Sequence, residues 1–434
     1  MSLSIDQIAA QLQGYDPQAL SAQDVNQFLA RLVEPVAQTE EVGIFDAMGR
    51  VLARDLVSPI SVPPHDNSAM DGFAFDGAAL ASTVPLVLKV VGTALAGQAW
   101  QGRAGAGEAV KIMTGAVMPE GLDTVVPQEL TRQQGDTITI AAGSLARGDN
   151  RRKLGEDLHA GQPALRGGDL LGPAALGLVA SLGVGRVTVW RKLRVAYFST
   201  GNEILSLGEA PREGAVYDSN RYTVFGLLSR LGVQVTDMGV VRDDPAELEA
   251  AFVAAAQGAD AIITSGGVSV GEADYTKAMM KKLSHDGGGV AFWRIAMRPG
   301  RPMAVGRIAA DTPAGRHSAV LFGLPGNPVA VMVTFLAFVR PALLQMMGCS
   351  GQATPMLRAR SMEPIRKKPG RTEYQRGVVG NAPDGSLQVR TTGNQGSGVL
   401  SSMVQANGLI VLHHAQGNVA VGEEVDVMMF DGAL

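Results

Sequence analysis

The sequence contains a single cysteine, Cys349, in 434 residues. One thiol excludes an intrachain disulfide, and it argues against both a zinc cluster and an exported, disulfide-stabilised scaffold. This cysteine usage favours a reducing compartment, so we expect a cytoplasmic protein. The first residues, MSLSIDQIAAQLQ, show no basic segment followed by an apolar core, and we therefore expect no secretory signal.

Charge of one sign and long apolar runs are also scarce. The net charge is -4 and the pI is near 5.9, which gives no general electrostatic basis for binding nucleic acid or an anionic membrane. Any anion site must therefore be local. The longest apolar stretches, 170–185 and 320–339, contain glycines and prolines, so we interpret both as core elements rather than membrane spans.

Glycine and proline, in contrast, are plentiful. The 54 glycines and 22 prolines indicate many turns, and a hydrophobic content of 46% is typical of a globular chain. The length predicts two to four domains, because one hydrophobic core rarely extends over so many residues.

The first half of the chain combines helical and β-type patterns. Apolar residues recur at helical spacing over 22–36, and 44–55 resembles a second, short helix. Short β-branched runs separated by glycine follow over 84–189, with one helix predicted at 172–183. This spacing indicates a β-rich domain inserted between helical pieces.

From residue 192 the pattern alternates between strand and helix, which predicts a parallel sheet with right-handed crossovers. Ligands bind such sheets at the carboxyl ends of the strands. The loops at 199–203 and 264–267 both fall at strand ends, so we expect them to share one crevice. An apolar helix then follows a Pro-Gly-Asn-Pro turn, and the tail from 354 has the pattern of a small β-barrel or sandwich.

The stretch IITSGGVSVGEADYTK at 262–277 is the strongest local signal. Glycines without a Cβ allow close backbone approach, and consecutive N–H groups at a helix start bind phosphate. Asp274 lies where the next helix should begin and could hold Mg²⁺. The alternative is an ordinary glycine turn in which Asp274 is a first-turn helix residue. The predicted ligand-binding residues of this stretch are Ser265, Gly266, Gly267, Ser269 and Gly271.

Further stretches occur in one order along nearly the whole chain: PPHDNSAMDGFAF, KIMTGAVMPEGLDTVVPQE, STGNEI, YDSN, RDDP, TSGGVSVGEADYTK, RPGRP and LPGNP. Together they resemble the molybdopterin molybdenumtransferase family, to which the gephyrin C-terminal domain is similar. Each stretch alone is modest support, whereas their shared order and separations make the resemblance specific.

The resemblance implies a multidomain α/β fold. Its parts are a three-layer α/β domain with a parallel-rich sheet, an inserted β-rich domain, a small linking domain and a C-terminal β-barrel-like domain. The boundaries that we expect are 34–52 with 159–182 for the linking domain, 53–158 for the inserted domain, 15–33 with 183–350 for the α/β domain, and 351–434 for the C-terminal domain.

The resemblance also implies a reaction. Family members insert molybdate into adenylylated molybdopterin with the help of Mg²⁺, and release AMP and molybdenum cofactor. It further implies a homodimer with its site at the interface, and contacts with other molybdenum cofactor biosynthesis proteins and molybdoenzyme apoproteins. Alternatives are a gephyrin-like assembly module without activity and a molybdopterin adenylyltransferase, whose single small domain and TGGTG-type loop fit this chain less well.

Carboxylates are the catalytic candidates, because cleavage of a phosphoanhydride needs a metal on the phosphoryl oxygens. The family match assigns Asp244 and Asp274 to Mg²⁺ and phosphate chemistry, with Glu203 in support as a third metal candidate. Helix capping at Asp243 or Asp244 and a solvated Glu203 are the alternatives. The match places three residues from the first half of the chain across the interface: Asp66, Thr114 and Asp157. For Asp66 the alternative is an Asx-turn with Ser68, and for Thr114 it is a glycine turn.

Arginines are the candidates for binding molybdate, because guanidinium groups bind oxyanions bidentately. We expect this role for Arg294, Arg298 and Arg301; many family members have lysine in place of the last two, so the selectivity for molybdate over tungstate stays open. Arg376 and Ser397 match positions that border the family site, with a surface arginine and a turn serine as alternatives. Pro325 and Pro328 are expected to stiffen the loop opposite the glycine loop.

Overall fold

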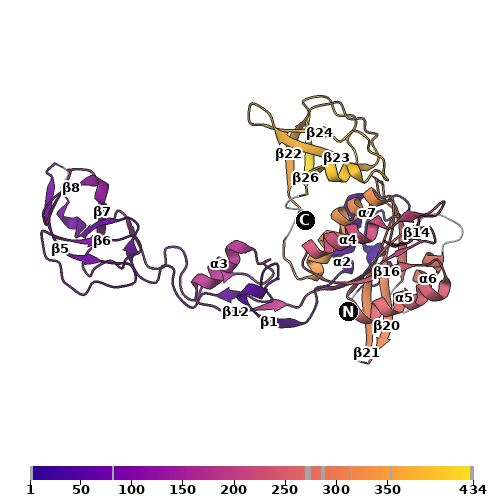
Figure 1. Cartoon of the computed structure of the whole chain (residues 1–434), viewed down its shortest axis with the longest axis horizontal. Helices are drawn as coiled ribbons and strands as arrows, with labels where there is room; N and C mark the ends of the chain where they lie inside the picture. Colours follow the sequence, from indigo (N-terminus) through magenta and orange to yellow (C-terminus); the bar gives the residue numbers. More distant parts are fainter. Residues whose placement is uncertain are drawn as a thin grey trace.

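The structure is a computed structural model that describes residues 3–80, 83–268, 275–284, 289–313, 315–351 and 354–430. The molecule is elongated (Figure 1): a β-rich domain lies at one end, a small linking domain in the middle, and an α/β domain at the other end, next to the C-terminal domain. Three residues predicted for the glycine loop, Ser269, Gly271 and Asp274, lie outside the described residues.

The inserted domain is built on a six-stranded sheet with the strand order β7-β4-β6-β5-β9-β8. Along β4, Phe73 and Phe75 pack into one core cluster and Ala74 into another, because successive side chains of a strand point to opposite faces. The strands of this sheet are β4 (Gly72–Phe75), β5 (Leu86–Ala94), β6 (Glu108–Ile112), β7 (Thr124–Pro127), β8 (Thr131–Gln134) and β9 (Thr137–Ile140). A separate pair in the same domain is formed by β3 (Asn67–Ser68) and β10 (Arg151–Arg152).

Two antiparallel strand pairs and one helix form the linking domain. β1 (Thr39–Gly43) pairs with β12 (Arg186–Trp190), and β2 (Leu56–Val57) pairs with β11 (Pro163–Leu165). Helix α3 (Pro173–Ser181) confirms the helix predicted at 172–183, and it begins with a proline in its first turn.

The prediction of a helix at 44–55 is wrong. The structure has only a 3₁₀ turn, Ile44–Asp46, and Gly49 has a φ of 70°, which ends any helical path. Val51 and Leu52 instead form β-bridges to Leu170 and Val189. Tertiary pairing therefore overrides the local helical pattern.

The α/β domain contains a six-stranded sheet with the order β16-β13-β17-β21-β20-β18. The first four of these strands run parallel to one another. At one edge, β20 is antiparallel to β21, and β18 is antiparallel to β20. The strands are β13 (Arg194–Thr200), β16 (Gln234–Val241), β17 (Ala261–Ser265), β18 (Val290–Arg294), β20 (Pro302–Thr312) and β21 (Gly315–Leu324).

Helices cover both faces of this sheet, so the domain has three layers. One core cluster joins the sheet to α2, α4, α7 and α8, and a second joins it to α5 and α6. The helices are α1 (Ile5–Gln11), α2 (Ala22–Leu32), α4 (Ser219–Arg230), α5 (Pro245–Gly258), α6 (Tyr275–Ser284), α7 (Pro328–Thr334) and α8 (Arg340–Met346). The predicted parallel-rich, three-layer fold is confirmed.

One helical stretch of the described chain, Pro328–Met346, is long and apolar enough to span a membrane, but 83% of its most apolar window is buried in the protein. It comprises α7, a π-helical segment (Phe335–Val339) and α8. Phe335 and Phe338 are fully buried against the sheet. This packing agrees with the core role predicted from its prolines.

The C-terminal domain is a closed five-stranded barrel, because β23 pairs with both β24 and β25 at the two ends of the order β23-β24-β22-β26-β25. A sixth strand, β19 (Met297–Arg298), comes from the α/β domain and pairs with β23. The barrel elements are β22 (Met356–Ser361), β23 (Thr372–Asn381), β24 (Leu387–Thr391), α9 (Ser401–Gln405), β25 (Gly408–Leu412) and β26 (Glu424–Met429). β19 therefore brings the barrel to the edge of the α/β domain.

Candidate functional site

The carboxyl ends of three neighbouring parallel strands lie at the same level. Ser199 of β13 pairs with Ser265 of β17, which in turn pairs with Leu324 of β21. The loops that follow these strands therefore meet at one edge, as predicted for 199–203 and 264–267.

Glycine is required at the tip of β17. Gly266 and Gly267 have φ values of 92° and 63°, a region that other residues rarely adopt. A Cβ on Gly266 would lie 2.5 Å from the carbonyl oxygen of Thr200, and a Cβ on Gly267 would lie 2.5 Å from Cβ of Thr276. The glycine pair therefore allows close packing of this tip against Thr200 and Thr276, and phosphate binding by it stays a prediction.

A cavity of about 710 Å³ opens at these tips. Its walls come from three places: the ends of β13 and β17, the segment 297–302 around β19, and the barrel loop that contains Ser397. Pro325 and Asn327 of the turn after β21 complete it. The cavity thus lies where the α/β domain meets the barrel.

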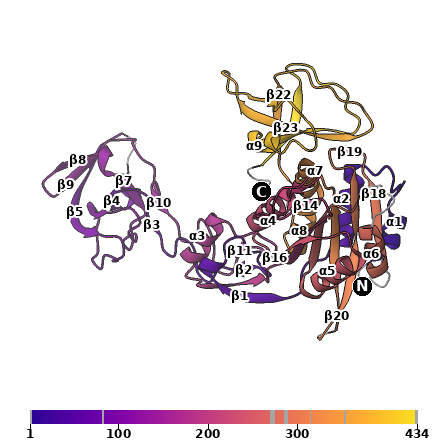
Figure 2. The same ribbon diagram turned by 45° about the vertical axis from the view of Figure 1, so that its right-hand side comes forward.

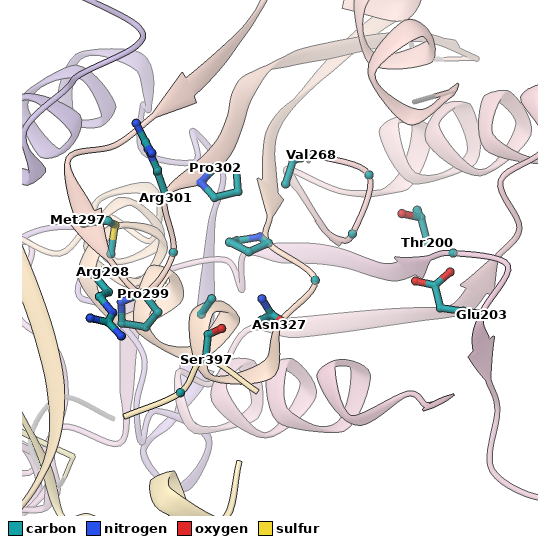
Figure 3. A pocket seen from close by; sticks show the side chains of 18 of the residues that line it. Thr200, Glu203, Val268, Met297, Arg298, Pro299, Arg301, Pro302, Asn327 and Ser397 are labelled. Carbon is teal, nitrogen blue, oxygen red and sulfur yellow. The ribbon is translucent and has the colours of Figure 1, made fainter. Parts of the chain in front are cut away.

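Charges of opposite sign line the two ends of this cavity. Figure 3 shows Arg298 and Arg301 at one end, Glu203 at the other, and Asn327 and Ser397 between them. Asp243 also lines the cavity. Such an arrangement can hold an oxyanion at the arginine end and a cation at the carboxylate end.

Arg376 is fully buried, so the alternative of a surface arginine is wrong. Its guanidinium donates hydrogen bonds to the carbonyls of Asn394 (3.2 Å) and Gly396 (2.9 Å) and to Oγ of Ser402 (2.9 Å). Burial lowers the pKa of Arg376 to about 10, and the nearby charge of Arg298 adds to this shift. Arg376 thus fixes the loop that presents Ser397.

Asp244 and Arg294 are not among the residues that line this cavity. Oδ1 of Asp244 accepts hydrogen bonds from the backbone N–H groups of Ala246 (2.9 Å) and Glu247 (3.0 Å), so this carboxylate caps α5. Arg294 is exposed at the end of β18 and does not line the cavity. The metal and oxyanion roles of these two residues stay predictions.

A second group of predicted residues lies in the inserted domain. Oδ1 of Asp66 accepts a hydrogen bond from the backbone N–H of Leu154 (2.8 Å), and Oδ2 lies 3.6 Å from Arg151. These contacts replace the Asx-turn considered for Asp66. Asp157 is exposed, and its backbone N–H donates to the carbonyl of Val62 (3.1 Å).

Thr114 binds a carboxylate that the sequence analysis missed. Its backbone N–H and its hydroxyl both donate to Oδ1 of Asp71, each at 2.7 Å. These two bonds lower the pKa of Asp71, the backbone bond contributing most. The loops of Asp66 and Thr114 are neighbours, because the N–H of Met118 donates to the carbonyl of Asp66 (2.9 Å).

Within one chain this second group does not reach the cavity. Figure 2 shows β3 and β10 of the inserted domain far from the α/β domain, with the linking domain between them. The structure therefore separates the predicted residues into two sets: one around Glu203 and Arg298, the other around Asp66 and Thr114.

Sequence reasoning named Asp243 beside Asp244 without assigning it a site role, and it missed Asn327 and Arg371; all three line the cavity. Arg371 lies 2.7 Å from Oε1 of the buried Glu373. Asp243 and Asn327 belong to stretches that carried the family resemblance, RDDP and LPGNP, whereas Arg371 lies outside them. That overlap was the available signal.

The fold and the cavity define a multidomain α/β protein with a charged cavity at its parallel strand tips. Family models agree: residues 20–183 match the MoeA N-terminal region (domain I and II), 196–345 a probable molybdopterin binding domain, and 358–430 the MoeA C-terminal region (domain IV). The chain belongs to the molybdopterin molybdenumtransferase family and is an enzyme of molybdenum cofactor biosynthesis.

Relatives support this assignment over nearly the whole chain. The molybdopterin molybdenumtransferase of Haemophilus influenzae is 41% identical over 399 residues, which are 92% of this chain and 95% of that protein. The Bacillus subtilis protein of the same name is 32% identical over 90% of each chain. The structure of a molybdopterin biosynthesis moeA protein from Pyrococcus horikoshii OT3 aligns with a TM-score of 0.78 and 26% identity, over 95% of this chain and 100% of that one.

Proposed function

We propose that this enzyme inserts molybdate into adenylylated molybdopterin and releases AMP and molybdenum cofactor in a Mg²⁺-dependent reaction. The observation that carries the proposal is the cavity with arginines at one end and carboxylates at the other. Both charges are needed, because the substrates carry phosphate and oxyanion groups and the bond to be broken is a phosphoanhydride.

Arg298 and Arg301 are the groups that we assign to molybdate. Each guanidinium offers a planar set of donors, which binds two oxygens of an oxyanion at once. Ser397, on the loop held by Arg376, adds a hydroxyl donor to the same cavity. Together these residues would neutralise and orient the bound oxyanion.

The tip of β17 is the group that we assign to the phosphates of the substrate. Gly266 and Gly267 let the tip of β17 pack closely against Thr200 and Thr276, and this tip forms part of the cavity wall that would face the phosphates. Pro325, which follows the neighbouring strand β21 and also lines the cavity, fixes the backbone there and limits the rearrangement needed on binding.

Mg²⁺ fits the carboxylate end of the cavity. Glu203 and Asp243 both line it, and Mg²⁺ is commonly bound through one or two carboxylates together with substrate phosphates. Bound there, the ion would neutralise negative charge on the phosphoryl oxygens. Asp244 and Asp274 are the further metal candidates predicted from the family resemblance.

A homodimer reconciles the two separated sets of residues. Asp66, Thr114 and Asp157 of one subunit complete the cavity of the other in our proposal. Large apolar side chains on the outer surface support such an assembly, since Phe45 of the linking domain is 97% exposed and Phe225 of α4 is 48% exposed. We place this dimer in the cytoplasm, where other cofactor biosynthesis proteins and molybdoenzyme apoproteins are its partners.

The direct test is release of AMP from purified adenylylated molybdopterin when molybdate and Mg²⁺ are added. We expect stoichiometric AMP, with sulfate in place of molybdate as the control. Folded protein that releases no AMP would contradict the proposed substrate. AMP release that persists when the divalent metal is chelated would contradict the proposed Mg²⁺ dependence.

A further inference from the structure

A second cavity, of about 530 Å³, lies beside the first at the start of helix α4. The two cavities share Thr200, Glu203 and Gly266, so they are neighbours at the same edge of the sheet. Asp218 and Asn220 line only the second cavity.

Asp218 contributes a buried carboxylate to the lining of this cavity. The residue is 4% exposed, and its Oδ1 caps α4 by accepting a hydrogen bond from the backbone N–H of Arg221 (3.0 Å). Its Oδ2 has no hydrogen-bond partner among the described residues. A buried acceptor left in this state is costly, unless a ligand supplies the donor.

Asn220 brings a second acceptor of the same kind. Its Nδ2 donates a hydrogen bond to the carbonyl of Gly326 (2.7 Å), and this bond fixes the orientation of the amide because a carbonyl can only accept. The side-chain oxygen, Oδ1, is buried and accepts no hydrogen bond from the part of the chain that the structure describes. Asp218 and Asn220 therefore each use one polar atom to hold the fold and leave one acceptor for a ligand.

We propose that Oδ2 of Asp218 and Oδ1 of Asn220 bind the pterin ring of the substrate through its N3–H and 2-amino groups. This inference rests on the proposed function and assigns a subsite within it. The pyrimidine edge of a pterin presents two adjacent donors, which match two acceptors from one helical turn. The pairing edge of adenine presents one donor beside one acceptor, so it matches this pair less well.

The rest of the second cavity suits the faces of a heterocycle. Ile204, Val216 and Tyr217 contribute apolar and aromatic surface to its lining. A ring seated there lies next to the first cavity, where the phosphates, Mg²⁺ and molybdate are assigned. The adjacency therefore allows one substrate to occupy both cavities.

A matched pair of ligands tests the proposal on the unmodified protein. Pterin and lumazine are both bicyclic and fluorescent, but lumazine has an oxo acceptor in place of the 2-amino donor. In a fluorescence titration we expect lumazine to bind at least about tenfold more weakly than pterin, because one donor is lost and two acceptors then face each other. Equal affinities, or no saturable binding of pterin up to its solubility limit, would overturn the assignment.

The variant Asp218→Asn tests the residue itself. It keeps an oxygen for the cap of α4 and replaces the free acceptor by an NH₂ donor, so we expect the thermal midpoint to change little and pterin to bind at least about tenfold more weakly. Asp76→Asn is the control, since Asp76 caps a 3₁₀ turn in the inserted domain by accepting from Ala78 (2.9 Å). Unchanged pterin affinity in folded Asp218→Asn would overturn the role of Asp218.

These titrations are distinguishable from the test of the proposed function. Wild-type protein that releases AMP but does not prefer pterin over lumazine would remove the subsite and leave the reaction in place. Protein that prefers pterin but releases no AMP would keep the subsite and contradict the reaction.

Discussion

Glu203 and Arg298 line the same cavity from opposite ends, one at the tip of β13 and the other on the strand that joins the α/β domain to the barrel. Neither residue is close to the other in sequence. Their shared cavity depends on the antiparallel edge of the sheet and on the pairing of β19 with β23. This relationship divides the site into an oxyanion end and a carboxylate end that can be tested separately.

At the oxyanion end, Arg298→Ala should raise the KM for molybdate by about tenfold or more, because a charge-assisted pair is worth roughly 1.5–3 kcal/mol. Arg298→Lys should recover part of the loss, since it restores the charge but not the planar donor set. Steady-state AMP release at varied molybdate measures both effects. Arg358→Ala, which removes a surface arginine paired with Glu424, is the control. Equal KM values in all variants would remove Arg298 from molybdate binding.

Arg376 acts, in our account, through the loop that it holds. Arg376→Ala leaves the carbonyls of Asn394 and Gly396 without their donor, so we expect a loss of about 2–4 kcal/mol in the free energy of unfolding and a raised KM for molybdate. Ser402→Ala removes one contact and should have a smaller effect on both. Chemical denaturation and AMP release give the two quantities. A stable Arg376→Ala variant with normal KM would show that the loop needs no such support.

Thr114 and Asp71 offer a test in the inserted domain. Thr114→Val removes the hydroxyl bond but keeps the backbone bond, so the pKa of Asp71 should rise toward its ordinary value without reaching it. NMR titration of the carboxyl measures the change, and AMP release should fall in the same variant. Thr137→Val is the control, because it removes a hydroxyl that donates a hydrogen bond to a different carboxylate of the same domain, Asp136 (3.3 Å). An unchanged pKa would contradict the observed pairing.

Asp260 makes stability depend on pH. Burial tends to raise the pKa of this carboxyl, but hydrogen bonds from Arg191 (2.7 and 2.8 Å) and Arg194 (3.1 Å) outweigh burial and lower it. The folded state therefore binds the proton less tightly than the unfolded state, and the contribution of Asp260 is present above about pH 4 and is lost as the pH falls through the lowered pKa.

The variant Asp260→Asn isolates that contribution. We expect it to cost about 3 kcal/mol near neutral pH, since one partner of a buried ion pair is removed, and to flatten the fall in stability at acidic pH. Asp136→Asn is the control: Asp136 lies 4.0 Å from Lys89 in an exposed ion pair, so its loss should change the free energy of unfolding little. Urea denaturation over a pH series measures both. Parallel wild-type and Asp260→Asn curves would contradict the assigned pKa direction.

Local sequence patterns predicted most elements of the α/β domain. The strands at 194–200, 234–241 and 261–265 and the helices between them follow the expected alternation, because periodicity and caps such as Asp218 agree with the tertiary fold there. The prediction of a helix at 44–55 was wrong for the opposite reason. Apolar residues of this segment form β-bridges to distant parts of the chain, and a local sequence pattern contains no information about such pairing.

The site was predictable in part. Glycine pairs and strand-end loops identified the crevice, and the family resemblance identified Glu203 and Arg298 within it. The capping role of Asp244 and the full burial of Arg376 depend on where each side chain points, which spacing does not fix. Asp71 was missed because its partnership with Thr114 joins residues 43 positions apart.

Mixed dimers test the central claim, that each reacting centre draws on two subunits. Asp66→Ala and Glu203→Ala should each abolish AMP release as homodimers, because each damages both centres. In tagged and purified heterodimers of the two variants, one centre has both defects and the other has neither, so we predict recovery of about half of wild-type AMP release. No recovery in verified heterodimers would contradict a centre shared between subunits.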